Sequence, residues 1–544
     1  MKKFFKIEYI VLFAFIVLQV TIGIFHEPWF DEAESWQIAR CAGYKELIFS
    51  VPHYEGHPPL WHLLLSIPAK LGLPYEISLK TVGILFNSIS VYLLLFKSPF
   101  KKWVRCLLPF TYFFFYQYGI VVRTYCVMIL AIMLIMITFK DKDSHPFRFV
   151  LSIILLCFTT AFGLAIGAGL AIAWLIDIIS EIGLKTFFKK LFSDKRILSL
   201  WLLLIGALFV VSLIMPKADT MATNAVVRNG IGLRSLYALF VAWADATMTD
   251  VLNGLLKLSA FDSISLLTAS VLGIIIILSI ILISKKKSIK YFLFMYFGIV
   301  VMIVSLYYNT HHEGILFFTL LLYFGLNRYI SGESCAHLLF IKYPDISSIK
   351  IVIKIELFTF FAVSILWTCS ASITDIRKPY SFGRDLATFI SEHELESEYI
   401  LTEWAEFPKG KEHGDLKYDT NQVDFIVDIL PYYDSLSTSL NAAEPWRGYL
   451  VHHEGNDDNS QNILALKKKG IPGVILGNPN LSRIYGDTVS MSDYEKVYEI
   501  KYVDACIRKF NYFDQPDYMY VRKDLLESHN LESILPRKRQ VQNE

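Results

Sequence analysis

Four carboxylates crowd into eight residues of the segment HEPWFDEAESWQIAR, which follows an apolar N-terminal run. These carboxylates are Glu27, Asp31, Glu32 and Glu34. A carboxylate beside a low-dielectric boundary resists ionisation unless it is paired, and such a group suits a general base or a cation ligand. The competing interpretation is a solvated helix N-terminus, where acidic residues favour the helix dipole. Spacing alone leaves both interpretations open.

A second polar group follows in the segment HYEGHPPLWHLLL. His53, Glu55 and His57 occupy alternate positions directly ahead of two prolines. Histidine and glutamate at this spacing can bind a divalent metal or a phosphate group. A loop histidine is more often a plain solvated residue, and the trio by itself carries little information. Its place in the same loop as the acidic cluster makes it a candidate part of one site.

Two further polar groups lie next to apolar runs later in the chain. Arg123 and Tyr125 stand in YQYGIVVRTYCVM, and His311 and His312 stand in YYNTHHEGILFF. A charged residue in an apolar helix is either functional or reaches to the interface by snorkelling. A guanidinium fork matches the geometry of a phosphate group, which makes Arg123 a candidate anion ligand. The two histidines could equally be an ordinary hairpin tip.

The composition shows which elements must position these residues. Of the 544 residues, 54% are hydrophobic and only 19% are charged, against about 25% in soluble domains. The net charge of +2 gives no electrostatic footprint for nucleic acid. A bilayer core about 30 Å thick needs about 20 apolar residues for each helix. We expect about eleven transmembrane helices, near residues 8–25, 76–96, 103–119, 121–139, 148–163, 164–180, 197–215, 263–283, 291–308, 314–329 and 351–371.

Lysine and arginine alternate between the loops of this arrangement. With the N-terminus in the cytoplasm, every loop expected inside carries several of them: 97–105, 140–148, 181–196, 284–290 and 327–354. The opposite hairpins carry almost none, which satisfies the positive-inside rule. We therefore expect a multi-pass protein of the cell membrane whose first loop, 26–75, and C-terminal tail lie outside the cytoplasm.

The tail differs in composition from the rest of the chain. Short β-rich runs, helical patterns and turn residues such as Gly-Asn-Pro-Asn alternate in it. The expected strands are 399–402, 448–451, 473–476, 494–502 and 518–521, and the expected helices include 383–392 and 461–469. The sequence thus predicts a transmembrane module, residues 1–371, followed by an extracytoplasmic α/β domain, residues 372–544.

Three motifs resemble the integral membrane glycosyltransferases of the C superfamily, which include protein O-mannosyltransferases and the lipid A aminoarabinose transferase. They are an acidic pair after the first helix (Phe30-Asp31-Glu32), a Pro-Pro-Leu element (His57-Pro58-Pro59-Leu60) and an Arg-x-Tyr element (Arg123-Thr124-Tyr125). The polytopic architecture with an α/β tail is also similar. The chain departs from the family where His57 replaces a frequent lysine and where His311-His312-Glu313 replaces a frequent Arg-Tyr pair.

The resemblance implies an inverting transfer of a hexosyl or pentosyl group from a polyprenyl-phosphate or polyprenyl-diphosphate donor to a lipid, glycan or protein. It implies Asp31 as the base, with Glu32 in support. The residues implied for the donor phosphate are Arg123, Tyr125, His53 and His57. Any divalent metal would fall to Glu55, His57, His311 and His312. The alternative is a transporter or flippase of a lipid-linked or anionic substrate, although the sequence lacks the repeated halves typical of many transporters.

Overall fold

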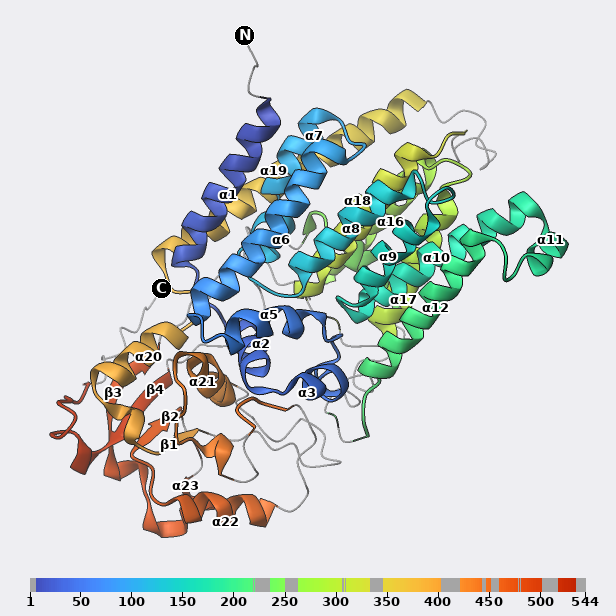
Figure 1. Ribbon diagram of the computed structural model, residues 1–544. Coiled ribbons are helices and arrows are strands. Elements are labelled where there is room, and N and C mark those ends of the chain that lie inside the picture. The colour runs from blue at the N-terminus through green and yellow to red at the C-terminus, as the bar shows by residue number, and fades with distance from the viewer. Residues whose placement is uncertain are drawn as a thin grey trace, which may run out of the picture.

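The computed structural model describes residues 6–218, 220, 235–249, 263–305, 308, 310–332, 346–402, 421–442, 447–451, 459–477, 479, 481–500 and 517–534. Helices dominate these residues (Figure 1). The longer helices are α1 (Ile7–Phe25), α6 (Tyr75–Lys97), α8 (Tyr125–Phe139), α9 (Pro146–Cys157), α10 (Ala161–Ile182), α12 (Lys195–Ile214), α16 (Ser263–Ile283), α17 (Ile289–Ser305), α18 (Glu313–Tyr329) and α19 (Ile346–Arg377). Shorter helices join them: α2 (Phe30–Cys41), α3 (Tyr44–Phe49), α4 (Pro52–Glu55), α5 (Leu60–Lys70), α7 (Lys102–Leu107), α11 (Leu184–Lys189) and α14 (Ala242–Asp245).

Among the described residues, six helices are long and apolar enough to cross a membrane: α1, α6, α10, α12, α16 and α19. Three more apolar helices, α8, α9 and α17, are shorter. Buried side chains from these helices form one large continuous apolar core. The architecture is that of a helical membrane protein, and each of the six long helices lies where the sequence predicted a span. The total of about eleven spans stays a prediction.

The predicted span at 103–119 is not one continuous helix. Pro109 follows α7 in a short 3-10 turn, where its missing N–H prevents helix continuation. Residues Phe113–Gln117 then form a single π-helical turn. Gly119 follows this turn, and a larger residue does not fit there, because a Cβ would lie 2.0 Å from the carbonyl oxygen of Phe115. Apolar length alone suggested a span here, but proline and tight backbone packing divide it.

The first loop is folded rather than extended. Its helices α2, α3, α4 and α5 cover one end of the helical bundle (Figure 1). Trp36 and Ala33 of α2 pack against Trp61 and Leu65 of α5 in a small buried core. This packing gives the acidic cluster a rigid platform at the end of α1.

The described part of the tail contains a four-stranded sheet with the order β1-β2-β4-β3. Its strands are β1 (Ile400–Thr402), β2 (Val474–Leu476), β3 (Tyr494–Ile500) and β4 (Asp517–Arg522), and its helices are α20 (Gly383–Glu392), α21 (Asn421–Ile429), α22 (Asn459–Lys469) and α23 (Leu481–Tyr485). β1 and β2 are parallel, whereas β4 is antiparallel to both of its neighbours.

Two sequence expectations differ from the structure, namely the strand at 448–451 and the end of the last span at residue 371. The strand expected at 448–451 is irregular, and residues 501–502 of the expected strand 494–502 lie outside the described residues. α19 does not end at the expected boundary, residue 371, but continues to Arg377. The sequence from 372 to 377 is polar enough to resemble a loop, yet it extends the last long helix toward the tail.

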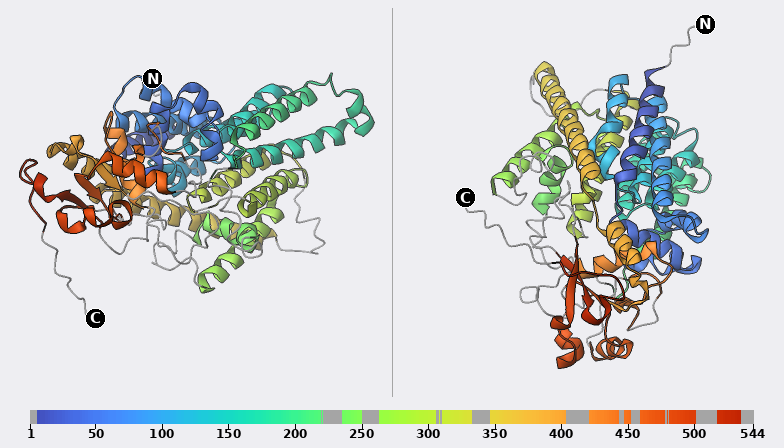
Figure 2. Two further views of the ribbon diagram at one scale, coloured as in Figure 1. Left: turned by 90° about the horizontal axis from the view of Figure 1, so that it is seen from below. Right: turned by 90° about the vertical axis from the view of Figure 1, so that its left-hand side faces the viewer.

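The tail lies at the end of the bundle that carries the first-loop helices (Figure 2, right). Polar contacts join it to α2 of the first loop and to α6. Arg384 Nε of α20 donates to Glu76 Oε1 of α6 at 2.8 Å, and the Tyr432 hydroxyl donates to the same oxygen at 2.8 Å. Arg40 Nη2 of α2 donates to the carbonyl oxygens of Leu430 and Tyr433 at 3.0 and 2.8 Å. The sheet and the first loop therefore share one end of the bundle.

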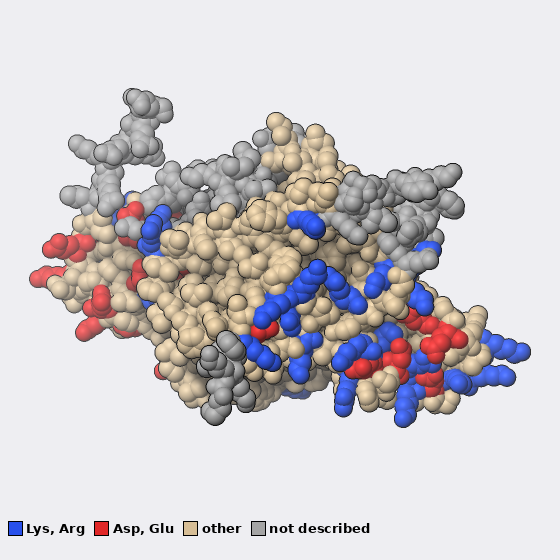
Figure 3. Space-filling model, turned by 90° about the horizontal axis from the view of Figure 1, so that it is seen from above, with Lys and Arg blue, Asp and Glu red and all other residues tan. Residues whose placement is uncertain are grey.

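Basic side chains gather at the opposite end. Figure 3 views the molecule from the side on which the N-terminus emerges, and lysine and arginine side chains cluster over the helix ends there. The connections α6–α7, α8–α9, α10–α12 and α16–α17 all turn at this end (Figure 1). This separation of the basic end from the end that carries the sheet agrees with the charge pattern on which the predicted sidedness depends.

Candidate functional site

The first turn of α2 and the loop before α8 meet at the end of the bundle that carries the sheet. Asp31 Oδ2 lies 2.6 Å from Arg123 Nη1, and the two side chains are only 15% and 14% exposed. Burial disfavours the charged guanidinium, but Asp31 outweighs that effect and raises the pKa of Arg123 above its ordinary value. The structure thus brings together two of the predicted site residues as a shielded ion pair.

Glu32 ties this pair to its surroundings from a fully buried position. Its Oε1 accepts the backbone N–H of Val122 at 2.7 Å, and its Oε2 accepts the backbone N–H of Trp29 at 3.3 Å. Glu32 therefore joins the start of α2 to the residue next to Arg123. With both oxygens engaged by protein donors, Glu32 is suited to positioning rather than to proton transfer with a substrate.

Three aromatic rings, those of Trp29, Tyr118 and Tyr125, form an aromatic bed next to the guanidinium. Arg123 Cζ lies 5.6 Å from the ring centroid of Tyr125 and 6.0 Å from that of Trp29. Tyr125 stacks on Tyr118 with 4.1 Å between the ring centroids, and the Tyr118 hydroxyl donates to the carbonyl oxygen of His311 at 2.7 Å. Cation–π contacts of this kind hold a guanidinium in place while leaving its N–H groups available for an anion.

His57 lies within electrostatic reach of the pair. Burial and the positive charge of Arg123 lower its pKa to about 4, although Asp31 opposes them. The imidazole is therefore neutral near pH 7, and it can offer a hydrogen bond to a ligand but no charge. His62 of α5, which the sequence did not single out, is also buried, and burial, His57 and Arg123 lower its pKa to about 3.

Other predicted residues lie elsewhere in the first loop. His53 Nδ1 is 2.6 Å from the carbonyl oxygen of Met215 at the end of α12, so this nitrogen is directed away from Arg123. Glu55 lines a shallow groove together with Tyr54, Arg447 and Tyr449. The expectation that His53 shares the phosphate site with Arg123 therefore has no contact to support it, because α4 turns these side chains toward α12 and the tail.

The proposed metal ligands do not gather into one set. His311 and His312 are buried, and their ring centroids are 4.0 Å apart. The ring of His312 also contacts Phe162 at 5.4 Å. Across the described residues, no three His, Cys, Asp or Glu side chains are grouped as a metal ion requires. A divalent metal remains a prediction.

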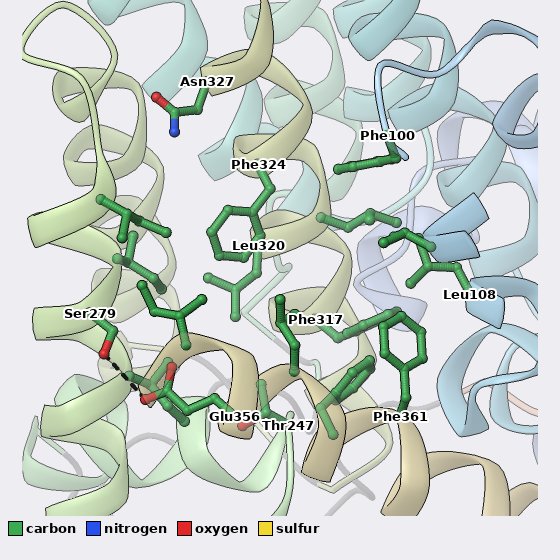
Figure 4. Close-up of a pocket in the computed structure, with 18 of the residues that line it drawn as sticks. Phe100, Leu108, Thr247, Ser279, Phe317, Leu320, Phe324, Asn327, Glu356 and Phe361 are labelled. Atoms are coloured by element: carbon green, nitrogen blue, oxygen red, sulfur yellow. Dashed lines mark hydrogen bonds between the residues drawn. The ribbon is translucent and has the colours of Figure 1, made fainter. Parts of the chain in front are cut away.

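An apolar cavity of about 460 Å³ lies among α7, α16, α18 and α19 (Figure 4). Phe317, Leu320 and Phe324 of α18 line one wall, and Phe361 of α19 faces them. Phe113 contacts both Tyr118 and Phe317, with centroid distances of 6.2 and 6.1 Å, so packed aromatic rings join this wall to the surroundings of Arg123.

The cavity also contains an intramembrane acidic residue. Glu356 of α19 accepts a hydrogen bond from Ser279 of α16 at 3.2 Å, as Figure 4 shows. Lys285 and Arg328 also line the cavity. Acidic side chains inside a bilayer are costly and are usually functional. Glu356 could not be singled out from the sequence, because one carboxylate in a long apolar run has no recognisable spacing.

Two further residues beside the candidate site were missed. His26 is fully buried at the end of α1 and contacts Glu32 at 3.2 Å and Asp375 of α19 at 3.0 Å. His26 and Asp375 are 349 residues apart, so no local motif links them. A histidine at the first position after a transmembrane helix was the only available signal.

The comparisons with known proteins add no family to this geometry. No family model matches the chain, and no curated protein matches it. The site must therefore be interpreted from its own residues.

Proposed function

We propose that this protein is a membrane glycosyltransferase that moves a sugar from a polyprenyl-phosphate-linked donor to an acceptor at the outer face of the cytoplasmic membrane. The observation that carries the proposal is the shielded ion pair between Asp31 and Arg123 at the membrane end of the first loop. It combines a carboxylate and an anion-binding guanidinium in a protein that also contains an apolar cavity of about 460 Å³. These are the groups that a lipid phosphate donor and a hydroxyl acceptor require.

In the proposed reaction Asp31 accepts the proton of the acceptor hydroxyl. The hydroxyl oxygen attacks the anomeric carbon while the bond from that carbon to the phosphate oxygen breaks. The bonding electrons leave with the polyprenyl phosphate, and the configuration at the anomeric carbon inverts. The products are the glycosylated acceptor, the free lipid phosphate and protonated Asp31, so atoms and charges balance.

Arg123 stabilises the charge that grows on the leaving phosphate. Fixed positive groups at such a position act mainly on the transition state, where the charge is larger than in the bound donor. Arg123 is held between Asp31 and the rings of Trp29 and Tyr125, so little reorganisation is needed. Neutral His57 would add a hydrogen bond to the donor without adding charge.

Donor binding has a consequence for Asp31. A carboxylate 2.6 Å from a guanidinium is a poor proton acceptor, because the neighbouring positive charge favours its ionised form. A donor phosphate competes for the same guanidinium and so releases Asp31 for the acceptor proton. The pair thus favours an order in which the donor binds before the acceptor.

The test is product formation by the purified protein in liposomes. Radiolabelled polyprenyl-phosphate hexoses and pentoses are offered with hydroxyl acceptors, and transfer is followed for wild type and Asp31→Asn. Glu392→Gln, which alters an exposed carboxylate of α20, is the matched control. We expect wild type and the control to transfer sugar and Asp31→Asn to be nearly inactive. Movement of the lipid or a solute across the membrane without a transfer product would instead support the transporter or flippase alternative.

A further inference from the structure

His26 is placed between two carboxylates in the interior of the protein. Its Nε2 lies 3.2 Å from Glu32 Oε2, and its Nδ1 lies 3.0 Å from Asp375 Oδ2. The three side chains are completely shielded from solvent or nearly so. Because each carboxylate accepts and neither donates when ionised, both ring nitrogens must carry a proton to satisfy this geometry. The arrangement therefore calls for an imidazolium.

The surroundings of His26 fix both ends of this bridge. The Tyr116 hydroxyl donates to Asp375 Oδ2 at 3.0 Å, and the ring of Tyr380 lies 4.7 Å from that of His26. Lys80 Nζ donates to the backbone carbonyl oxygen of His26 at 2.6 Å. The bridge thus connects the end of α1 with α6, with α19 and with the π-helical turn that precedes Arg123.

Glu32 transmits this anchoring to the candidate site. One of its oxygens faces His26, and the other holds the backbone N–H of Val122 at 2.7 Å. Val122 precedes Arg123, and Glu32 follows Asp31 in α2. A rotation of the Glu32 carboxylate would therefore displace both partners of the Asp31–Arg123 pair at once.

We infer that His26, bridging Glu32 and Asp375 as an imidazolium, is a positioning residue that holds Asp31 and Arg123 in their reactive geometry. The inference rests on the proposed sugar transfer. Its physical basis is charge balance: without the imidazolium, Glu32 and Asp375 would be two uncompensated buried anions. One of them would have to take up a proton or move, and the loop that carries Arg123 would move with it.

The bridge predicts a pH dependence. Burial favours the neutral ring, but Asp375 and Glu32 outweigh it and raise the pKa of His26 from 6.5 to about 9. The stabilisation is then fully present below pH 6.5 and is lost as the pH rises through about 9. Besides the two carboxylates, the charged groups that face His26 are Lys80 and Arg384, both of which donate to its backbone carbonyl oxygen.

The first experiment measures transfer by His26→Gln and by the double variant His26→Gln/Asp375→Asn. The single change leaves two buried carboxylates, whereas the double change restores the original net charge of the group. We expect the kcat of the single variant to be at least tenfold below that of wild type. The kcat of the double variant should be at least threefold above that of the single variant. His145→Gln alters an exposed histidine and should be silent. No recovery in a double variant that folds would overturn the inference.

The second experiment separates this inference from the proposed function, because it needs no substrate. The Tm of wild type and of the two His26 variants is recorded from pH 6 to pH 10. We expect wild type to lose Tm steeply around pH 9 and His26→Gln not to show this step. Parallel profiles for the two proteins would overturn the bridge even if sugar transfer is confirmed.

If His26→Gln does not fold, the double variant and the alkaline decline of wild-type kcat decide the question. A wild-type rate that stays constant through pH 10 would refute the positioning role.

Discussion

Replacing Arg123 with lysine tests the central element of the proposed chemistry. The guanidinium is in contact with Asp31 at 2.6 Å and lies 5.6 Å from the ring of Tyr125. Lysine keeps the positive charge, so Asp31 retains a counterion and the fold should survive. It loses the planar fork with which a guanidinium binds a phosphate group through two N–H groups. We therefore expect Arg123→Lys to be folded but slow.

The size of the loss follows from the number of contacts removed. A hydrogen bond to a charged group contributes about 1.5–3 kcal/mol, and each 1.36 kcal/mol is a factor of ten in rate. Loss of one such bond to the leaving phosphate lowers kcat/KM roughly 10- to 150-fold. The weakened ring contacts contribute about 0.5–1 kcal/mol to stability, which shifts Tm by a few degrees at most.

The assay compares steady-state transfer from a lipid-linked sugar by wild type, Arg123→Lys and Arg40→Lys. Arg40 is a suitable control because it lies in α2, the helix that carries Asp31, and donates to backbone carbonyl oxygens of the tail rather than to Asp31. We expect only Arg123→Lys to lose transfer. An unchanged rate for that variant would show that Arg123 merely reaches the interface by snorkelling, since lysine does that equally well.

Three further outcomes are expected. Asp31→Asn should lower the transfer rate about 10²- to 10⁴-fold with normal expression, measured with a lipid-linked donor, and a near-normal rate would remove Asp31 from the role of base. Burial and Asp385 raise the pKa of Glu27 to about 8, although the backbone N–H of Arg384 opposes them, so stability falls as the pH rises from about 4.5 to 8. Glu27→Gln should flatten the Tm profile over that range, and an equally steep profile would contradict this. In a background without native cysteines, Asn459→Cys should react with an impermeant maleimide in intact cells, and reaction only after permeabilisation would reverse the predicted sidedness.

The sequence predicted those parts of the fold that depend on local pattern. Apolar length located the six long helices, and alternation with turn residues located β1 to β4. The span at 103–119 was wrong as one continuous helix, because apolar length does not register the break that Pro109 imposes. The last long helix, α19, continues past the span end predicted at residue 371 to Arg377.

In the candidate site, too, the sequence indicated single residues but not the contacts between distant ones. Asp31 and Arg123 were singled out by residue type beside apolar runs, and the structure places them in contact. The predicted phosphate role of His53 depended on chain proximity to His57, but the turn through α4 directs its Nδ1 to Met215. His26 and Asp375 could not be paired from sequence, because their contact joins the two ends of the membrane module. Such long-range buried polar pairs leave no periodic pattern in a single sequence.

The location of the ion pair bears on the class of donor. The pair lies at the end of the bundle that carries the sheet, whereas lysine and arginine gather at the other end (Figure 3). The sidedness predicted from the positive-inside rule puts the basic end in the cytoplasm and would make the pair face outward. Nucleotide sugars are made and kept in the cytoplasm and cannot reach an outward site. On that sidedness the proposed donor is one that crosses the membrane with its sugar attached to a lipid, and the apolar cavity of about 460 Å³ is a candidate place for the lipid chain.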